Sequence, residues 1–341
     1  MKSKEPLYHY QMDRSCLISP IIYKQNYKIV HVGGGPRHNH PYEINLNIYP
    51  MEGVDIVGDA ENLPFEDNSV DVIISCAVLE HVENIEKVVE EINRVLKPNG
   101  LVYIEIPYMQ HYHTHDVYGV KFEDYRRYTK VGLIRLFEKY IAPVKVGVCV
   151  GPVSTCLQML HTLVEDIVDN KFIKKLNDFL YYYVGNMLVQ YDGTLSDRVL
   201  ENTRIPSGIF FFGMKKGEAE SMLRQVGYPN SVFPKTIKYE MTLLENKDKL
   251  VLSVKNTSDT IWLCKSPVSW GEVHIGVQVL QHGEWNRDFE RINLPKDVYP
   301  DDSITFSYTI PRDIVCDAVK FDLVAENVCW FEEFGNSPIK V

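Results

Sequence analysis

The sequence predicts two domains: an α/β domain with a mostly parallel, doubly wound sheet, followed by a C-terminal all-β sandwich. From residue 28 to 107, short β-rich runs alternate with turns and an amphipathic helix, a pattern typical of βαβ units. After about residue 235, helical periodicity disappears and short strand-like runs recur between turn signals, which is typical of a small sandwich. The length of 341 residues also favours two domains over one.

The first domain contains five predicted strands in succession, at 28–32, 44–48, 54–57, 71–78 and 101–106. The fourth is a nearly continuous apolar run, as expected for a strand buried on both faces of a parallel sheet. Between the fourth and fifth strands, apolar residues recur at three- and four-residue spacing from Ile85 to Leu96. This spacing predicts a helix, with Asn84 as its N-cap and the turn Pro98-Asn99-Gly100 after it.

Residues 108–205 are predicted to be mostly helical, and a strand at 207–214 completes the domain. The most apolar stretch, 179–191, is too short and too interrupted to span a membrane. We expect it to be a buried core helix, with an interfacial helix as the alternative. The predicted organisation is therefore a first domain at 1–216, a linker at 217–235 and a sandwich at 236–341.

Charge and cysteine usage limit the possible environments and partners. The formal net charge of −10 argues against broad binding to nucleic acid or to anionic membranes, because both need surplus Lys and Arg. The seven cysteines form no Cys-x-x-Cys pair and several lie in apolar runs, which indicates thiols of a reducing compartment. No signal-peptide-like core and no run of 18 apolar residues is visible. We expect a cytoplasmic protein without a transmembrane segment and leave its oligomeric state open.

Two glycines mark the first candidate ligand site. Gly33 and Gly35 directly follow the first strand, at the edge of the sheet where its carboxyl end lies. Glycine there allows a sharp turn and lets the backbone approach a ligand closely. The alternative interpretation is an ordinary tight turn.

Three further motifs follow in order: GDAENLPF at 58–65, DVIISCAVLEHV at 71–82 and RVLKPNG at 94–100. Their succession resembles the class I S-adenosylmethionine-dependent methyltransferases of the type 11 kind, and the likeness covers most of 28–216. The resemblance implies a Rossmann-like fold, methyltransferase activity and S-adenosylmethionine as the cofactor. It places Asp59 near the adenine amine, Ala60 against the adenine ring, and Ser75 among the cofactor contacts.

The sequence departs from the family pattern at three positions. His31 stands where an acid is usual, Arg37 where a third glycine is common, and Asn47 where an acid holds the ribose. Asparagine can still donate to and accept from a diol, although without the strength of a carboxylate. Only 36–43 separates the glycine turn from the second strand, which predicts a shortened crossover without a full helix. We expect Arg37 or His38 to pair with the methionine carboxylate of the cofactor.

The short crossover also bears on a rival interpretation, a nicotinamide-dependent dehydrogenase. A dinucleotide needs the helix N-terminus that receives its pyrophosphate, and the motif Gly33-x-Gly35-x-x-His38 lacks the third glycine. The sequence therefore disfavours this alternative.

A cluster of ionisable residues follows the fifth strand, at His111, His113, His115 and Asp116. Its spacing matches no recognised closed metal site, so no metal is predicted, and an exposed histidine-rich loop is one alternative. The other is catalytic, because His113 resembles a histidine of sugar-pathway methyltransferases that precedes a D-Y-x-R-Y-T stretch, here 124–129.

On this resemblance His113 is the predicted general base and Asp124 the alternative base, with Tyr125 and Arg127 contacting the substrate. The competing interpretation of 124–129 is a structural, salt-bridged helix start. His81 is expected to be structural.

The second domain carries its own resemblance. NTSDTIW at 256–262, RINLP at 291–295 and DLVAENVCWF at 322–331 resemble a β-sandwich appended to enzymes of bacterial surface-polysaccharide assembly. The domain is also similar to the sugar-binding domain of some polysaccharide export ATPases. The resemblance implies O-methylation of a sugar, nucleotide-sugar or glycan. A non-catalytic glycan-binding protein with a degenerate methyltransferase fold is the alternative. We expect at least two of the four tryptophans to be buried.

Overall fold

The computed structural model describes residues 22–23, 26–36, 40–117, 120–195, 197–217, 229–232, 234, 236–246, 249–266, 271–311 and 314–341. The chain divides into two compact units after Gly217. We call the part that ends at Gly217 unit 1 and the part that follows it unit 2. Residues 218–228 of the predicted linker lie outside the described residues.

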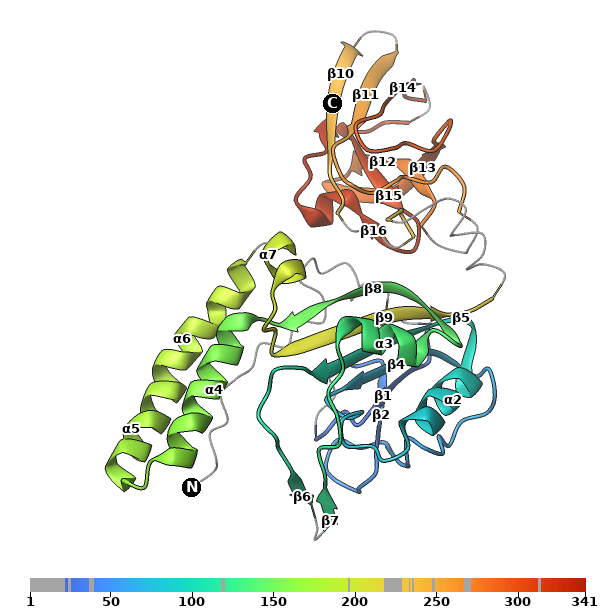
Figure 1. Ribbon diagram of the computed structural model, residues 1–341. Coiled ribbons are helices and arrows are strands. Elements are labelled where there is room, and N and C mark those ends of the chain that lie inside the picture. Colours follow the sequence, from blue (N-terminus) through green and yellow to red (C-terminus); the bar gives the residue numbers. More distant parts are fainter. Residues whose placement is uncertain are drawn as a thin grey trace. The chain divides into compact units, whose positions relative to one another are not determined.

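Unit 1 is built on a seven-stranded sheet with the order β3-β2-β1-β4-β5-β9-β8 (Figure 1). Its strands are β1 (Ile29–Val32), β2 (Glu43–Asn47), β3 (Ile56–Val57), β4 (Val70–Cys76), β5 (Leu96–Pro107), β8 (Ile141–Val150) and β9 (Gly208–Lys215). β1 to β5 pair in parallel, whereas β9 is antiparallel to both of its neighbours, β5 and β8. This order confirms the predicted α/β fold with a mostly parallel sheet.

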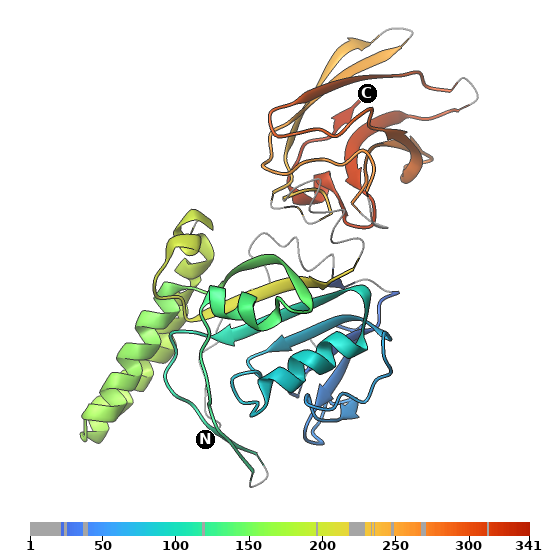
Figure 2. The same cartoon turned by 45° about the vertical axis from the view of Figure 1, so that its right-hand side comes forward.

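Two helices pack on one face of this sheet, α2 (Ile85–Val95) and α3 (Lys130–Phe137) (Figure 2). The predicted cap of α2 is present, because the Asn84 side chain accepts a hydrogen bond from the Lys87 backbone N–H. Phe137 of α3 stacks on Phe211 of β9 with ring centroids 4.9 Å apart, and both rings are fully buried. Truncation of such a ring to alanine costs about 3–5 kcal/mol, so this contact anchors α3 to the sheet.

The connections differ in part from the sequence prediction. Residues 33–36 and 40–42 form turns rather than a helix, which is consistent with the predicted short crossover. Residues 108–205 are less helical than predicted, because they contain β8 and the hairpin β6 (His115–Val117) and β7 (Val120–Phe122). Among the described strands β8 pairs with β9 alone, and its register shifts next to Pro143, as expected for proline in an edge strand.

Two antiparallel helical rods extend away from the sheet of unit 1 (Figures 1 and 2). One is α4 (Pro152–Ile167); the other comprises α5 (Lys171–Leu180), a π-helical turn (Tyr181–Gly185) and α6 (Asn186–Leu188). A 3₁₀ turn (Val189–Thr194) and α7 (Asp197–Asn202) lead back to the sheet. We call residues 152–191 the helical hairpin.

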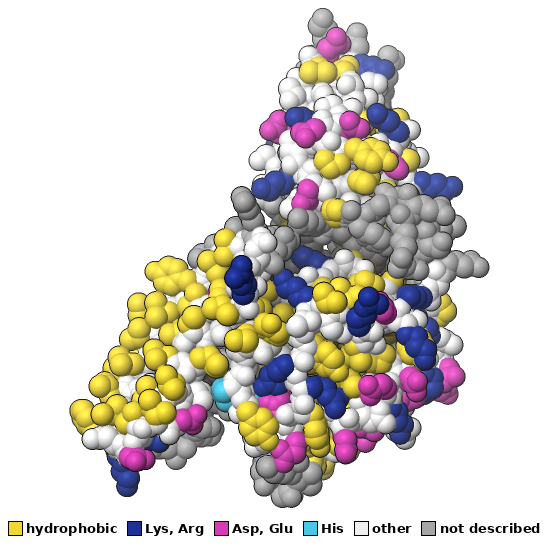
Figure 3. Space-filling view, in the orientation of Figure 1, with side chains coloured by type: hydrophobic (Ala, Val, Ile, Leu, Met, Phe, Trp, Pro, Cys, Tyr) yellow, Lys and Arg dark blue, Asp and Glu magenta, His cyan; other side chains and the backbone are white. Residues whose placement is uncertain are grey.

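The prediction that 179–191 forms a buried core helix is wrong. Phe179, Tyr183 and Met187 are 54%, 53% and 68% exposed. Figure 3 shows apolar side chains gathered over this part of the surface. The rods project past the sheet, which therefore offers no face against which these side chains could pack.

Unit 2 consists of antiparallel strands in two main sheets. One contains β10 (Tyr239–Asn246), β11 (Leu250–Asn256) and β14 (Ser303–Tyr308); the other contains β12 (Val273–Gln281), β13 (Glu284–Asn293), β15 (Ala318–Ala325), β16 (Cys329–Trp330) and β17 (Ile339–Lys340). Phe306 and Tyr308 of β14 contact Phe321 of β15, so the sheets pack face to face. This confirms the predicted C-terminal all-β fold.

The described tryptophans of unit 2 differ in burial, and the prediction that at least two of the four are buried stays a prediction. Trp262 is fully buried, whereas Trp285 and Trp330 are half-buried. Trp270 lies outside the described residues. Among the three described tryptophans, then, only Trp262 is a core residue.

Two features of the described residues, their cysteines and the character of their helices, concern the environment of the protein. Their six cysteines are all free thiols. In the same part of the chain, no helix has the length and apolar character needed to cross a bilayer.

Candidate functional site

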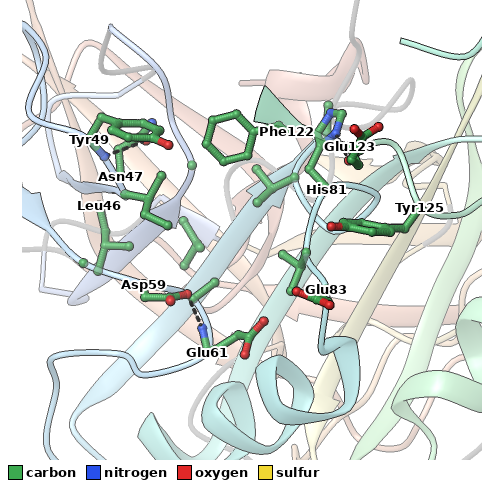
Figure 4. Close-up of a pocket in the computed structure, with 18 of the residues that line it drawn as sticks. Leu46, Asn47, Tyr49, Asp59, Glu61, His81, Glu83, Phe122, Glu123 and Tyr125 are labelled. Atoms are coloured by element: carbon green, nitrogen blue, oxygen red, sulfur yellow. Dashed lines mark hydrogen bonds between the residues drawn. The ribbon is translucent and has the colours of Figure 1, made fainter. Parts of the chain in front are cut away.

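A cavity of about 380 Å³ opens at the carboxyl ends of β1, β2 and β4. We call it the cleft. Its lining comes from the ends of these strands and the turns after them, and from Gly58 to Glu61 after β3. Phe122, Glu123 and Tyr125, at the end of the β6–β7 hairpin, complete it. In Figure 4, Asn47 and Tyr49 lie across the cavity from His81, Glu123 and Tyr125. This edge of an α/β sheet is where ligands bind.

The glycine turn after β1 has a backbone that requires glycine. Gly33 has a φ of +74° and Gly35 a φ of +71°, both in the left-handed region. A Cβ atom on Gly33 would lie 2.3 Å from Cγ2 of Val78. Gly33 lines the cleft, where its backbone would be accessible to a ligand. A Cβ atom on Gly35 would have no atom of the described residues within 4 Å, so this glycine is needed for the φ of the turn.

Asn45 holds this turn in place and was missed in the sequence. Its buried side-chain amide donates to the carbonyl oxygens of Gly35 (2.8 Å) and Gly53 (2.6 Å). It therefore ties the turn after β1 to the turn before β3. The signal in the sequence was a polar residue between the apolar residues Ile44 and Leu46.

The predicted cofactor residues are distributed unevenly around the cleft. Asn47, Asp59 and Ala60 all line it. The Asp59 carboxylate is exposed and accepts a hydrogen bond from the Glu61 N–H (2.9 Å), whereas the Asn47 side-chain oxygen accepts a long one from Tyr49 N–H (3.5 Å). A neutral amide suits a diol and a carboxylate suits an amine, so this donor and acceptor set fits an adenosine.

The other predicted cofactor residues have different placements. Ser75 is buried beneath the cleft, in a small apolar void between Val32 and Leu79, and its hydroxyl has no hydrogen-bond partner among the described residues. Its position does not favour contact with a ligand in the cleft. Arg37 and His38, expected to pair with the methionine carboxylate, lie outside the described residues.

The opposite wall of the cleft depends on the β6–β7 hairpin. Phe122 ends the second hairpin strand and Glu123 follows it, and both line the cleft together with Tyr125. The Phe122 ring meets Tyr49 edge-on with centroids 5.4 Å apart. Tyr125 was predicted from the sequence, whereas Phe122 and Glu123 were not, because strands of three residues are too short to show a periodic pattern.

His81 also lines the cleft, although the sequence favoured a purely structural role. Its Nδ1 donates to the Glu123 carbonyl oxygen (2.9 Å), which can only accept. In the neutral ring Nε2 is then an acceptor, and it lies 3.8 Å from Oε1 of Glu80. His113 stands behind His81, with ring centroids 5.0 Å apart, and its Nε2 lies 3.9 Å from the same Glu80 oxygen.

Glu80 lies at the centre of this group. Its side chain is fully buried, and neither carboxylate oxygen has a hydrogen-bond partner among the described residues. Burial raises its pKa to about 8. The ligand atoms of Glu80, His81 and His113 lie within 4.8 Å of one another, so this group can hold a shared proton or a divalent cation.

His113 is in turn oriented by Asp124. The Asp124 carboxylate accepts from the His113 backbone N–H (3.1 Å) and lies 3.2 Å from His113 Nδ1. Burial would raise the pKa of Asp124, but Arg127 and the His113 N–H outweigh it and hold this pKa below its usual range. Burial lowers the pKa of His113.

The terminal nitrogens of Arg127 are engaged within the chain. They donate to both oxygens of Asp124 and to the carbonyl oxygens of His111 and Arg126. Thr129 then caps α3 by accepting from Gly132 N–H (3.0 Å). This placement favours the salt-bridged helix start over a substrate contact for Arg127. It also favours an orienting role for Asp124 over that of a base.

Comparison with known proteins identifies the domain. A family model described as a methyltransferase domain matches residues 42–104. Over 53 residues the chain is 49% identical to a demethylmenaquinone methyltransferase of Staphylococcus aureus, covering 15% of this chain and 22% of that protein. Over 56 residues it is 43% identical to the biotin biosynthesis bifunctional protein BioHC of Cellvibrio japonicus, covering 16% and 11%. The chain spans between 11% and 22% of the length of such curated relatives.

Solved structures resemble the chain only weakly. A Haemonchus contortus phosphoethanolamine N-methyltransferase 2 has a TM-score of 0.37 at 15% identity, covering 60% of this chain and 52% of that one. The [4+2]-cyclase SpnF has a TM-score of 0.38 at 12% identity, covering 59% and 80%. The assignment depends instead on the family model and on the sheet order. Unit 1 is a class I methyltransferase domain of the kind that uses S-adenosylmethionine.

Proposed function

We propose that the protein transfers a methyl group from S-adenosylmethionine to a hydroxyl oxygen of a small acceptor, with a sugar or glycan as the acceptor class. The observation that carries this proposal is the shared cleft. Gly33, Asn47 and Asp59 form one side of it, and His81, Phe122 and Tyr125 lie toward the other. A cofactor and an acceptor could therefore meet in one cavity.

The cleft has the size of a small-molecule site, and its cofactor side fits S-adenosylmethionine in chemistry. A volume of about 380 Å³ lies within the range of small-molecule sites. Gly33 lets the backbone approach the ligand, Asn47 can both donate to and accept from the ribose hydroxyls, and Asp59 can accept from the adenine amine. When bound, the cofactor supplies a methyl group that is already activated by its sulfonium.

The acceptor side has groups that can take a hydroxyl proton. A histidine that is neutral near pH 7 is suited to this task. We assign it to the pair His81 and His113, of which His81 lines the cleft and His113 is oriented by Asp124. The negative charge of Asp124 would stabilise a proton on His113. Phe122 and Tyr125 offer aromatic surface to the acceptor, and aromatic rings pack well on the apolar faces of sugars.

The glycan part of the proposal comes from the resemblance of unit 2. Its two half-buried tryptophans, Trp285 and Trp330, make cation–π contacts with basic side chains. Arg287 and Arg291 lie 5.1 and 4.6 Å from the Trp330 ring centroid, and Lys320 and Lys340 each lie 5.0 Å from that of Trp285. These clusters are the candidate contacts for a glycan, while the cleft in unit 1 would hold the methylated group.

Two experiments test the function in sequence. Calorimetric titration of the full chain with S-adenosylhomocysteine should show binding that Asp59→Ala weakens and the exposed control Glu66→Ala leaves unchanged. Absence of binding at millimolar S-adenosylhomocysteine would contradict the proposed methyltransferase activity. It would favour a non-catalytic glycan-binding protein with a degenerate methyltransferase fold. If binding is present, mass spectrometry of a panel of nucleotide-sugars and glycans incubated with S-adenosylmethionine would identify the acceptor.

A further inference from the structure

The helical hairpin of unit 1 presents an unusual amount of apolar surface. On α4 the exposed side chains recur at helical spacing and include Leu160 (59% exposed), Leu163 (52%) and Ile167 (69%). The second rod continues the pattern over its whole length, with Phe172 (75%), Leu176 (45%), Phe179 (54%), Tyr183 (53%) and Met187 (68%). Figure 3 shows this apolar surface along the hairpin.

The seam between the two rods is, by contrast, polar. His161 Nε2 donates to Asp178 (3.1 Å), and the Asn177 amide donates to Glu165 (3.3 Å). The His161 ring also stacks on Tyr181 with centroids 4.2 Å apart. A helical hairpin that works alone in water places its apolar residues in the seam and its polar residues outside. The helical hairpin here is arranged the other way round.

The exposed area is large enough for a stable interface. A side chain of this size that is half exposed leaves on the order of 100 Å² of apolar surface in water. Together the exposed side chains of the two rods exceed the few hundred Å² of an ordinary surface patch and reach the ~800 Å² that each partner buries in a standard protein interface.

The charges at the far end of the helical hairpin favour a protein over a membrane as the partner that covers its apolar surface. That end carries Glu165, Asp166 and Asp169 together with Lys171, Lys174 and Lys175, so its charges balance. Insertion into a bilayer by this end would bury six charges, and a balanced surface gains no attraction to anionic lipid. Binding of a second copy of the chain requires neither the burial of these charges nor an attraction to lipid, because symmetric apolar faces complement each other.

We propose that the helical hairpin is a homodimerisation element. Two copies pack their apolar rods against each other about a two-fold axis as a four-helix bundle, with the charged ends in water. This inference is independent of methyl transfer, because no hairpin residue lines the cleft.

The mass of the full chain in solution tests the proposal. Light scattering after size-exclusion chromatography should give twice the chain mass of 39.4 kDa. The double variant Leu163→Glu/Phe179→Glu should give 39.4 kDa with an unchanged far-ultraviolet circular dichroism spectrum, a loss of at least about 100-fold in dimer affinity. The matched control is Val131→Glu, which places the same charge at an equally exposed apolar site on α3 and should remain dimeric.

A monomeric wild-type chain at the highest soluble concentration would overturn the proposal. So would a dimer that the double variant does not dissociate. Flotation of a monomeric wild-type chain with phosphatidylcholine vesicles would show that a membrane covers the helical hairpin instead. If the double variant precipitates, hydrogen exchange of the wild type decides: α4 and α5 amides should be better protected at high than at low protein concentration, and equal protection contradicts dimerisation.

Discussion

The Nδ1 atom of His113 lies 3.2 Å from Oδ2 of Asp124, and the same nitrogen lies 3.2 Å from the carbonyl oxygen of His111. The carbonyl can only accept, and the ionised carboxylate also only accepts, so the ring proton belongs on Nδ1. The lone pair of the neutral ring is then on Nε2, on the side of Glu80 and His81. Asp124 thus fixes the tautomer that a proton acceptor needs.

Exchanging this carboxylate for an amide tests that relationship. In the proposed reaction, Asp124→Asn should lower kcat about 10- to 100-fold with little change in KM, because the amide can donate to Nδ1 and favour the wrong tautomer. Since burial lowers the pKa of His113, the acid limb of the wild-type kcat profile should have its inflection below the ordinary value of 6.5. His81→Gln and His113→Gln, measured over the same pH range, identify which histidine titrates. An unchanged profile in both would exclude a histidine base.

Asp59 is expected to contribute directly to cofactor affinity. Asp59→Ala should weaken binding of S-adenosylhomocysteine by about 1–3 kcal/mol, the usual loss for a charged hydrogen-bond partner. Calorimetry on the variant and on the exposed control Glu66→Ala gives the difference. Equal affinities in all three proteins would mean that the adenine lies elsewhere.

Asn47 offers a test in the opposite direction. If its side chain faces the ribose, Asn47→Asp should tighten S-adenosylhomocysteine binding by about 1 kcal/mol, because a carboxylate accepts more strongly from the diol. Titration at two salt concentrations separates this local effect from a general change in charge. Weaker binding by Asn47→Asp would place the ribose away from this residue.

Asn45 acts on the glycine turn without entering the cleft. Asn45→Leu removes both donors and leaves the carbonyl oxygens of Gly35 and Gly53 without them, which should cost about 1–3 kcal/mol of unfolding free energy. It should also weaken cofactor binding, because the turn loses its support. Urea denaturation and calorimetry measure the two effects. Asn45→Ser, which keeps a small polar group, should be milder, and a stable Asn45→Leu with normal affinity would refute the role.

The buried carboxyl of Glu80 should make stability depend on pH. Its folded-state pKa of about 8 lies above the ordinary 4.5, so the folded chain keeps a proton that the unfolded chain loses. The resulting stabilisation is complete below pH 4.5 and is lost as the pH rises through about 8. Glu80→Gln removes this dependence. Between pH ~5 and pH ~9 its free energy of unfolding should therefore rise relative to that of the wild type, by up to a few kcal/mol. Thermal denaturation over this pH range measures the difference, with a substitution of the same kind at an exposed site, Glu66→Gln, as the control.

The sequence predicted the features of unit 1 that arise from local patterns. Apolar runs located β1, β4 and α2, and the glycine turn and Asp59 were found because each directly follows a strand. Ser75 was harder to place, because both faces of β4 are buried and alternation no longer indicates which side chains face the cleft. The stretch 179–191 shows a different limit. Apolar residues indicate that a surface is covered, but not whether the chain itself or a partner covers it.

Other features depend on contacts between residues distant in the sequence. The wall made by Phe122 and Glu123 exists only because a hairpin of very short strands returns to the cleft. The sequence of β13 does not by itself indicate a strand, because most of its side chains are polar and exposed, with no apolar alternation. Its position comes from pairing with β12.

The position of β9 in the sheet has a consequence for folding of the chain during its translation. This strand is the last of unit 1 in the chain, yet it lies between β5 and β8 in the sheet. While the ribosome is still translating the helical hairpin, β5 and β8 have no common neighbour, and their unpaired edges are open to other chains. The sheet can close only after Lys215 has left the exit tunnel. Nascent chains that stall or end before that residue should therefore be held by chaperones or degraded, whereas those released just beyond Gly217 contain every strand of the sheet.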